Sequence, residues 1–186
     1  MKEKSLAVFL DRDGVLNQPV VRNGCPFPPQ SLGEVTILPG VKDACRKLRD
    51  AGYLLIAVTN QPDIARGTAK PESVAAINKY LQDELGIHEF SICPHDDLDR
   101  CACRKPEPGM LVQAAAKWNI DLKASFMVGD RWRDIEAGHR AGCKTAFIDY
   151  AYNERRPAWM NVSVASLEEA AGWILALTRK ELDCHV

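Results

Sequence analysis

Residues 6–16, LAVFLDRDGVL, join a short apolar run to two carboxylates that are two residues apart. The apolar run is long enough for one buried strand of a parallel sheet. In open parallel sheets ligands bind at the carboxyl ends of the strands, so Asp11 and Asp13 fall where chemistry is expected. A turn at Gly14 would let both side chains face one cleft. Asp-x-Asp-Gly is also ordinary turn chemistry, so this motif alone leaves a purely structural interpretation open.

The length and composition predict a single domain over residues 1–186 with a large buried core. The formal net charge is −1, with acids and bases interspersed, so neither nucleic acid nor a membrane surface is an expected partner. No signal peptide or membrane-spanning segment is recognisable, and we expect a cytoplasmic protein. Because no long apolar patch is evident, we expect a monomer. Seven cysteines in a reducing compartment favour metal binding or burial over disulfides.

Apolar runs alternate with helical patterns along the chain. After the first strand, further strands are expected at residues 53–58, 89–92, 126–128 and 145–148. Helices are expected to begin near residues 40, 71, 108 and 135, and a last helix is expected from the Ser166 capping box to about residue 177. The alternation predicts a doubly wound, Rossmann-like parallel α/β sheet. Residues 17–33 and 149–160 are expected to be loops, and we place 17–33 beside the substrate because they follow the two carboxylates.

Polar side chains recur at the carboxyl ends of the later strands. Thr59 follows the second strand, and Asp130 and Asp134 follow the fourth. Lys105 precedes the helix between the third and fourth strands. Several carboxylates in one cleft repel one another unless a cation lies between them, and oxygen ligands select a hard ion such as Mg²⁺. A lysine and a hydroxyl beside that ion are suited to bind a phosphate, so the set indicates phosphoryl transfer.

A second candidate metal site lies directly after the third strand. Its four potential ligands are Cys93, His95, Cys101 and Cys103. Three sulfurs and one imidazole are typical of a closed tetrahedral zinc site, although a chance cluster of thiols remains the alternative. A zinc ion here would be structural, because no coordination position is left for water. The loop 93–103 would then present Arg104 and Lys105 to the cleft.

Four short motifs resemble those of the haloacid dehalogenase-like superfamily, in that family's order and at its strand ends. The matching residues are Asp11-Arg12-Asp13-Gly14-Val15-Leu16, Thr59, Lys105 and Gly129-Asp130-x-x-x-Asp134. The resemblance covers about residues 6–149. The dehalogenases that name the superfamily work without the second aspartate of the first motif, so Asp13 favours phosphate over carbon–halogen chemistry.

The resemblance implies a role for each matching residue. Asp11 would attack phosphorus and form an aspartyl-phosphate, while Asp13 would act as general acid and then as general base. Mg²⁺ would be held by the Asp11 carboxylate, the Asp13 backbone carbonyl and Asp130, with support from Asp134. The remaining two residues, Thr59 and Lys105, would bind the transferring phosphoryl group.

The cysteine loop narrows the resemblance to a capless branch, which includes heptose-bisphosphate 7-phosphatases and histidinol-phosphate phosphatases. In the absence of a large cap domain, the substrate would meet the cleft through the loops 17–33, 60–67 and 93–103. The substrate-side residues implied in these loops and directly after them are Asn60, Gln61, Arg66 and Arg104. Both arginines could clasp a second phosphate or a carboxylate through paired hydrogen bonds.

The segment Pro62-Asp63 departs from the branch, which typically has Ser-Gly at these two positions. Proline removes a backbone N–H that could bind phosphate, and Asp63 adds a negative charge near the substrate path. We expect a small phosphorylated sugar, most directly D-glycero-D-manno-heptose 1,7-bisphosphate cleaved at the 7-phosphate. Histidinol phosphate or another small metabolite is the alternative, as is transfer of the phosphoryl group to an acceptor other than water. An inactive zinc-stabilised binding module is a further alternative, which the presence of both Asp11 and Asp13 disfavours.

Overall fold

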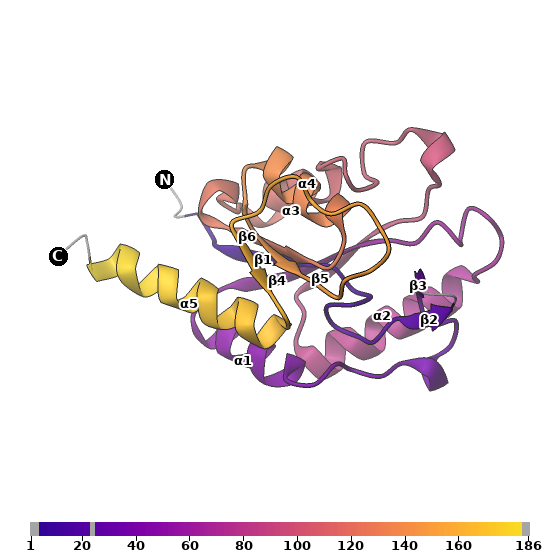
Figure 1. The fold of residues 1–186 in the computed structure, drawn as a ribbon, viewed down its shortest axis with the longest axis horizontal. Coiled ribbons are helices and arrows are strands. Elements are labelled where there is room, and N and C mark those ends of the chain that lie inside the picture. Colours follow the sequence, from indigo (N-terminus) through magenta and orange to yellow (C-terminus); the bar gives the residue numbers. More distant parts are fainter. Residues whose placement is uncertain (1–3, 23–24, 184–186) are drawn as a thin grey trace.

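The structure is a computed structural model that describes residues 4–22 and 25–183 of the chain. Six parallel strands form one sheet in the order β5-β4-β1-β6-β7-β8 (Figure 1). Their bounds are Ala7–Leu10 for β1, Leu54–Asn60 for β4, Glu89–Cys93 for β5, Phe126–Gly129 for β6, Lys144–Ile148 for β7 and Val162–Val164 for β8. The predicted doubly wound parallel sheet is confirmed.

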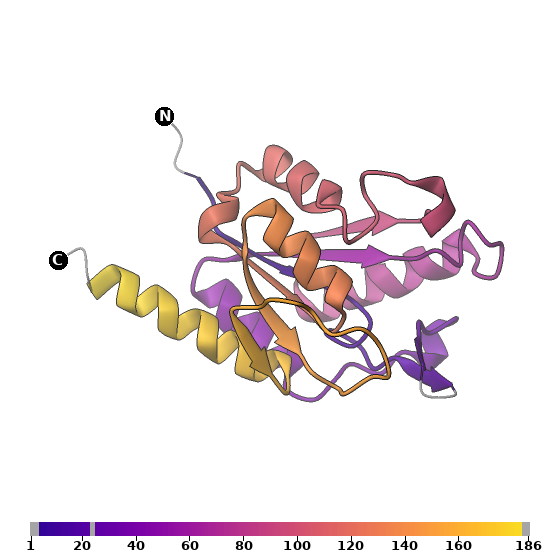
Figure 2. The ribbon, with the colours of Figure 1, turned by 45° about the horizontal axis from the view of Figure 1, so that its top comes forward.

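Helices cover both faces of this sheet (Figure 2). The helices of one face are α1 (Val41–Asp50), α2 (Pro71–Leu85) and α5 (Leu167–Asp183), and those of the other face are α3 (Gly109–Trp118) and α4 (Trp132–Ala141). Side chains alternate along β1, so that Val8 packs toward the first group of helices and Phe9 toward the second. Both residues are fully buried, and the sheet therefore has a hydrophobic core on each side.

The register of the central strands brings the predicted motifs together. Leu10 of β1 is paired with Ala57 of β4 and with Val128 of β6. One residue further along, Asp11 lies beside the ends of both neighbouring strands, and its N–H donates to the Val128 carbonyl at 3.0 Å. Thr59 and Asp130 follow at the same edge, which is why residues so distant in the sequence share one site.

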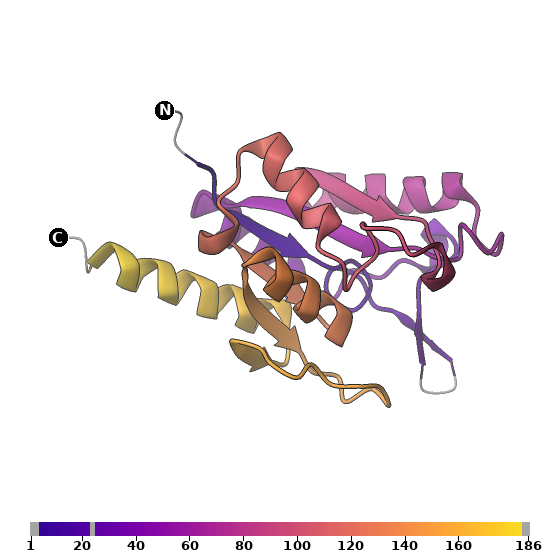
Figure 3. The same ribbon diagram turned by 90° about the horizontal axis from the view of Figure 1, so that it is seen from above.

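Residues 17–33 were expected to form a loop, but the structure shows that they are partly regular. They contain a short antiparallel hairpin, β2 (Val20–Arg22) and β3 (Cys25–Phe27), and a single turn of 3₁₀ helix, η1 (Leu32–Glu34). Figure 3 shows the hairpin projecting beyond the carboxyl ends of the central strands. Strands of three residues are too short for an alternating pattern to be visible in the sequence.

Three other elements differ from the expectation, and one of them is α4, which begins at Trp132 and not near residue 135. The edge strand β8 was not predicted, because it is three residues long and no side chain in it is buried. Helix α5 runs to Asp183, beyond the expected end near residue 177. Within the part of the chain that the structure describes, no helix combines the length and the hydropathy needed to cross a bilayer.

Candidate active site

Asp11 and Lys105 form the buried centre of the site. The Lys105 Nζ atom lies 2.6 Å from Asp11 Oδ1 and 2.6 Å from Asp134 Oδ1. It also donates to the Val58 carbonyl at 2.6 Å. The exposed fractions of the Asp11 and Lys105 side chains are 12% and 2%. A single ammonium group is therefore shared by two buried carboxylates.

Burial changes the ionisation of this cluster. The pKa of Asp11 is raised to about 6, chiefly by burial. Lys105 acts to lower this pKa, and the nearby negative charges of Asp134 and Asp13 act to raise it. The pKa of Asp130 is raised well above its usual range, chiefly by burial and then by Asp11 and Asp134. Burial alone would lower the pKa of Lys105, but its two carboxylate neighbours raise it on balance. Full ionisation of all the carboxylates therefore requires more positive charge than Lys105 supplies.

The same carboxylates fit a divalent cation. Asp11, Asp130 and Asp134 each offer a carboxylate oxygen, and these atoms lie within 4.8 Å of one another. Among the described residues, no side chain or backbone group makes a hydrogen bond of normal geometry with either buried oxygen of Asp130. Oxygen ligands with unused lone pairs are what Mg²⁺ requires.

Gly14 permits the close approach of Asp130 to the first motif. A Cβ atom at Gly14 would lie only 2.0 Å from Asp130 Oδ2, and the φ angle of Gly14 is +91°. No other residue type fits this position without displacing the carboxylate. The glycine of the first motif is thus required by the acid cluster as well as by the turn.

Asp13 is held by four hydrogen bonds from three side chains. Its Oδ2 accepts from Arg12 Nε at 3.1 Å, from Arg12 Nη2 at 2.8 Å and from Gln61 Nε2 at 3.0 Å. Its Oδ1 accepts from Asn17 Nδ2 at 2.9 Å. Arg12 is fully buried and also donates to Asn78 Oδ1 at 3.0 Å. Neither the Asn17 contact nor the contact between Arg12 and Asn78, which are 66 residues apart, was predicted from the sequence.

The predicted residues after β4 have distinct contacts. Gln61 Nε2 also donates to Thr59 Oγ1 at 2.9 Å, so Gln61 links the hydroxyl to Asp13. Asn60 binds the backbone of Lys105 twice: its Nδ2 donates to the carbonyl and its Oδ1 accepts from the N–H, both at 3.0 Å. Asn60 therefore positions Lys105, a contact that the sequence analysis did not predict.

A cavity of about 400 Å³ opens over the acid cluster. The sequence-predicted residues that line it are Asp11, Asp13, Thr59, Asn60, Arg66, Arg104, Lys105, Asp130 and Asp134. Pro19, Phe27 and Pro28 line it too, so the 17–33 segment lies beside the cavity, as expected. Gln61 is buried and does not line the cavity. A volume of this size is typical of a site for a small metabolite.

The two predicted arginines already have acidic partners. Arg66 forms ion pairs with Asp96 and, at 3.5 Å, with Asp63. Arg104 donates through Nε to Asp97 at 2.8 Å and through Nη1 to the His95 carbonyl at 3.2 Å. The charge of Asp63 is thus partly compensated by Arg66, which reduces the repulsion that its sequence position suggests.

The four predicted zinc ligands converge at the end of β5. The Sγ atoms of Cys93, Cys101 and Cys103 are 3.2–3.6 Å apart. His95 Nδ1 lies 3.3 Å from Cys103 Sγ and 3.6 Å from Cys93 Sγ. Zn–S bonds of about 2.3 Å in a tetrahedron would separate the sulfurs by roughly 3.8 Å, so the cluster fits one zinc ion with little adjustment. The three cysteines carry free thiols.

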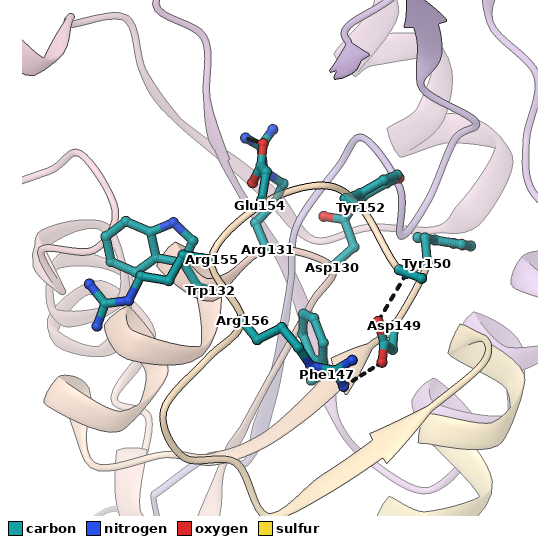
Figure 4. Close-up of a pocket in the computed structure, with 11 residues that line it drawn as sticks. Asp130, Arg131, Trp132, Phe147, Asp149, Tyr150, Tyr152, Glu154, Arg155 and Arg156 are labelled. Atoms are coloured by element: carbon teal, nitrogen blue, oxygen red, sulfur yellow. Dashed lines mark hydrogen bonds and ion pairs between the residues drawn. The ribbon is translucent and has the colours of Figure 1, made fainter. Parts of the chain in front are cut away.

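The loop 149–156 passes beside Asp130 (Figure 4). In that view Tyr152 lies beside Asp130, and the pKa of Tyr152 is raised by burial and by this carboxylate. Glu154 binds Arg131, with Arg131 Nε at 2.8 Å from Glu154 Oε2. This segment was expected to be a polar loop, and neither contact could be predicted, because nothing in its composition indicates which strand end it lies beside.

The comparisons with known proteins agree with this geometry. A family model described as HAD-hydrolase-like matches residues 102–160. A D-glycero-β-D-manno-heptose-1,7-bisphosphate 7-phosphatase from Yersinia pestis is 34% identical over 187 residues, which cover 94% of this chain and 92% of that protein. The chain belongs to the haloacid dehalogenase-like phosphatases. The predicted family is therefore confirmed, and the chain is a phosphoric monoester hydrolase.

Two further relatives of this haloacid dehalogenase-like phosphatase cover most of its length. A protein of the same name as the Yersinia pestis enzyme, from Rhodopseudomonas palustris, is 37% identical and covers 73% of this chain and 79% of its own. A solved structure of a D,D-heptose 1,7-bisphosphate phosphatase from B. bronchiseptica, complexed with magnesium and phosphate, has a TM-score of 0.79 and 31% identity. It covers 92% of this chain and 98% of its own.

Proposed function

We propose that this protein is a Mg²⁺-dependent phosphatase that removes the 7-phosphate of D-glycero-D-manno-heptose 1,7-bisphosphate. The observation that carries the proposal is the convergence of Asp11, Asp13, Lys105 and the two later aspartates on one cavity of about 400 Å³. The relatives that match nearly the whole chain carry heptose-bisphosphate phosphatase names, which supports this substrate over histidinol phosphate.

The chain's own residues provide a covalent route. An oxygen of Asp11 attacks phosphorus, the bond to the sugar oxygen breaks, and an aspartyl-phosphate forms. Asp13 gives its proton to the leaving sugar oxygen and later takes a proton from the water that attacks the aspartyl-phosphate. That attack releases inorganic phosphate and restores Asp11. Lys105 and Thr59 hold the phosphoryl oxygens during both steps.

The acid cluster would hold Mg²⁺ through Asp11, the Asp13 backbone carbonyl, Asp130 and Asp134. When bound, the ion neutralises the negative charge of the transferring phosphoryl group. The buried oxygens of Asp130, which lack a hydrogen bond of normal geometry among the described residues, and the raised pKa values of Asp11 and Asp130 support this assignment.

Several further features belong to the same proposal. A structural zinc ion bound by Cys93, His95, Cys101 and Cys103 would fix the loop that precedes Lys105. The substrate side of the site would be completed by Asn60, Gln61, Arg66 and Arg104. Asn60 would act by positioning Lys105, and Gln61 by holding Thr59 and Asp13. The whole activity would reside in one domain over residues 1–186, acting as a monomer in the cytoplasm, with neither nucleic acid nor membrane as a partner.

Phosphate release from a panel of phosphorylated metabolites tests the proposal. With Mg²⁺, heptose 1,7-bisphosphate is expected to have the highest kcat/KM. Asp11→Asn should lower turnover by about 10³-fold or more, because a neutral amide is not a nucleophile. Asp83→Asn, on the exposed face of α2, is the matched control and should retain wild-type turnover. Near wild-type activity in Asp11→Asn would refute the covalent route. A preference for histidinol phosphate would refute the assignment of heptose 1,7-bisphosphate as the substrate.

A further inference from the structure

Two arginines beside the cavity share a single carboxylate. Arg104 Nε and Arg133 Nη1 lie 2.8 and 2.9 Å from the same oxygen, Asp97 Oδ1. Arg133 Nη2 lies 3.4 Å from the other oxygen, Oδ2. Arg104 directly follows the zinc-ligand loop, whereas Arg133 belongs to the first turn of α4. Two guanidinium groups and one carboxylate give this Arg104–Asp97–Arg133 cluster a formal charge of +1.

The other arginines that line the cavity have no such excess of charge. Arg66 lies between Asp63 and Asp96, so that group has a formal charge of −1. Arg131 is paired one to one with Glu154. The positive excess at the rim of the cavity is therefore located at the Arg104–Asp97–Arg133 cluster.

The cluster also has hydrogen-bond donors to spare. Each guanidinium has five N–H groups, and the hydrogen bonds with described residues use two from Arg104 and two from Arg133. The Arg133 guanidinium lies 5.0 Å from the centre of the Trp132 ring, which restricts its motion. The remaining donors are thus pre-organised for a planar or tetrahedral anion.

The position of the cluster limits where an anion could bind. Asp97, Arg104 and Arg133 line the cavity over the acid cluster, and they also line a neighbouring cavity of about 460 Å³ beside the zinc-ligand loop. The cluster therefore forms the boundary between the two spaces. A substrate whose phosphoryl group lies at Asp11 would direct its other end toward this boundary if that end is anionic.

We propose that Arg133 determines specificity by binding, together with Arg104, the phosphate of the substrate that is not cleaved. This inference rests on the proposed function and assigns one of its unknowns, the location of the second phosphate. From the sequence alone, Arg66 and Arg104 were the residues expected to clasp a second phosphate or a carboxylate. The charges of their neighbours favour Arg133 in place of Arg66.

The test compares two substrates that differ only in the second phosphate, D-glycero-D-manno-heptose 1,7-bisphosphate and D-glycero-D-manno-heptose 7-phosphate. Arg133→Ala should lower kcat/KM for the bisphosphate by about 10-fold or more, mainly through KM, and leave the 7-phosphate within about 2-fold. Arg133→Lys should retain part of the preference, because it keeps the charge but loses the paired donors. Arg140→Ala is the matched control, since Arg140 lies on the same helix and pairs with Glu107 and Glu136.

The outcomes separate this inference from the function on which it rests. If the wild-type enzyme does not hydrolyse the bisphosphate, or does not prefer it, the proposed function fails and the inference fails with it. If the wild type prefers the bisphosphate but Arg133→Ala affects both substrates equally, or neither, only the inference is overturned. Arg133→Gln, which keeps hydrogen-bond donors near Asp97, gives the same comparison should the alanine variant fail to fold.

Discussion

Replacing Lys105 with methionine would remove the ammonium group that Asp11 and Asp134 share while keeping most of the side-chain volume. In the metal-free protein, Asp11 and Asp134 would each lose a partner at 2.6 Å. Both carboxylates are almost fully buried, so water cannot replace the lost charge. We therefore expect Lys105→Met to destabilise the metal-free fold strongly and to depend on Mg²⁺ for its stability.

The distances set the size of the effect. At an effective dielectric constant of about 20, two unit charges 2.6 Å apart attract by roughly 6 kcal/mol. Desolvation of the ammonium group cancels much of this attraction, and removal of one partner of a buried pair typically costs about 3–5 kcal/mol. For a chain of this size, that loss corresponds to a fall in Tm of roughly 6–20 °C.

The loss should also depend on pH. A carboxyl whose pKa is raised in the folded state stabilises the fold while protonated, and this contribution is lost as the pH rises through the folded-state pKa. In the wild type that window runs from the ordinary value of 3.8 to about 6 for Asp11. Because Lys105 lowers the pKa of Asp11, its removal extends the window upward. Lys105→Met should therefore lose more stability near pH 8 than near pH 5.5.

Thermal unfolding followed by circular dichroism in EDTA, at about pH 5.5 and about pH 8, measures both effects. Lys117→Met is the matched control, because Lys117 is 63% exposed and its ion pair with Glu89 should contribute no more than about 1 kcal/mol. Saturating Mg²⁺ should restore a large part of the Tm of Lys105→Met. The reasoning fails if Lys105→Met loses no more stability than the control, or loses equal amounts at both pH values.

Three other predictions follow from the metal sites. Protein purified without added metal should contain about one zinc per chain by elemental analysis, and Cys103→Ser should lose that zinc. The control is Cys143→Ser, which removes a buried thiol outside the cluster and should keep the zinc. Gly14→Ala should weaken Mg²⁺ binding by about 10-fold or more in calorimetric titration, because the added Cβ would displace Asp130. Gly52 has a similar φ of +88° but no neighbour within 4 Å of an added Cβ, so Gly52→Ala should leave the Mg²⁺ affinity unchanged. Mg²⁺ should raise the Tm of the wild type more near pH 8 than near pH 5.5, because protons compete with Mg²⁺ for the acid cluster at the lower pH. An equal rise at both pH values would argue against Mg²⁺ binding to the acid cluster.

The sequence was most informative where a strand ends in polar residues. The run before Asp11 and the runs before Thr59 and Asp130 are continuous and apolar, so both the parallel sheet and the shared edge could be predicted from them. The convergence of the four candidate zinc ligands was predictable for a similar reason, because all four lie within the loop 93–103 and need no knowledge of the fold.

The contacts that sequence reasoning missed all depend on side chains meeting across the fold. Arg12 was visible within the first motif, but its bond to Asn78 of α2 is set by how that helix packs. Arg133 was hidden for a different reason, since an arginine in the first turn of a helix is usually solvated. The folded structure shows that Arg133 borders the cavity and that it shares Asp97 with Arg104.

The proposed zinc site and the phosphoryl site are linked by a very short segment of chain. Lys105 lies two residues after Cys103, and the Asn60 side chain binds both its N–H and its carbonyl. Apart from one turn of 3₁₀ helix, the loop 93–103 has no regular structure beyond the end of β5, so ordering it costs roughly 1–2 kcal/mol per residue in backbone entropy. Zinc ligands at both ends of the loop would offset that cost and hold Lys105 within 2.6 Å of Asp11. A zinc ion that never touches the substrate would therefore determine where the phosphoryl group is bound.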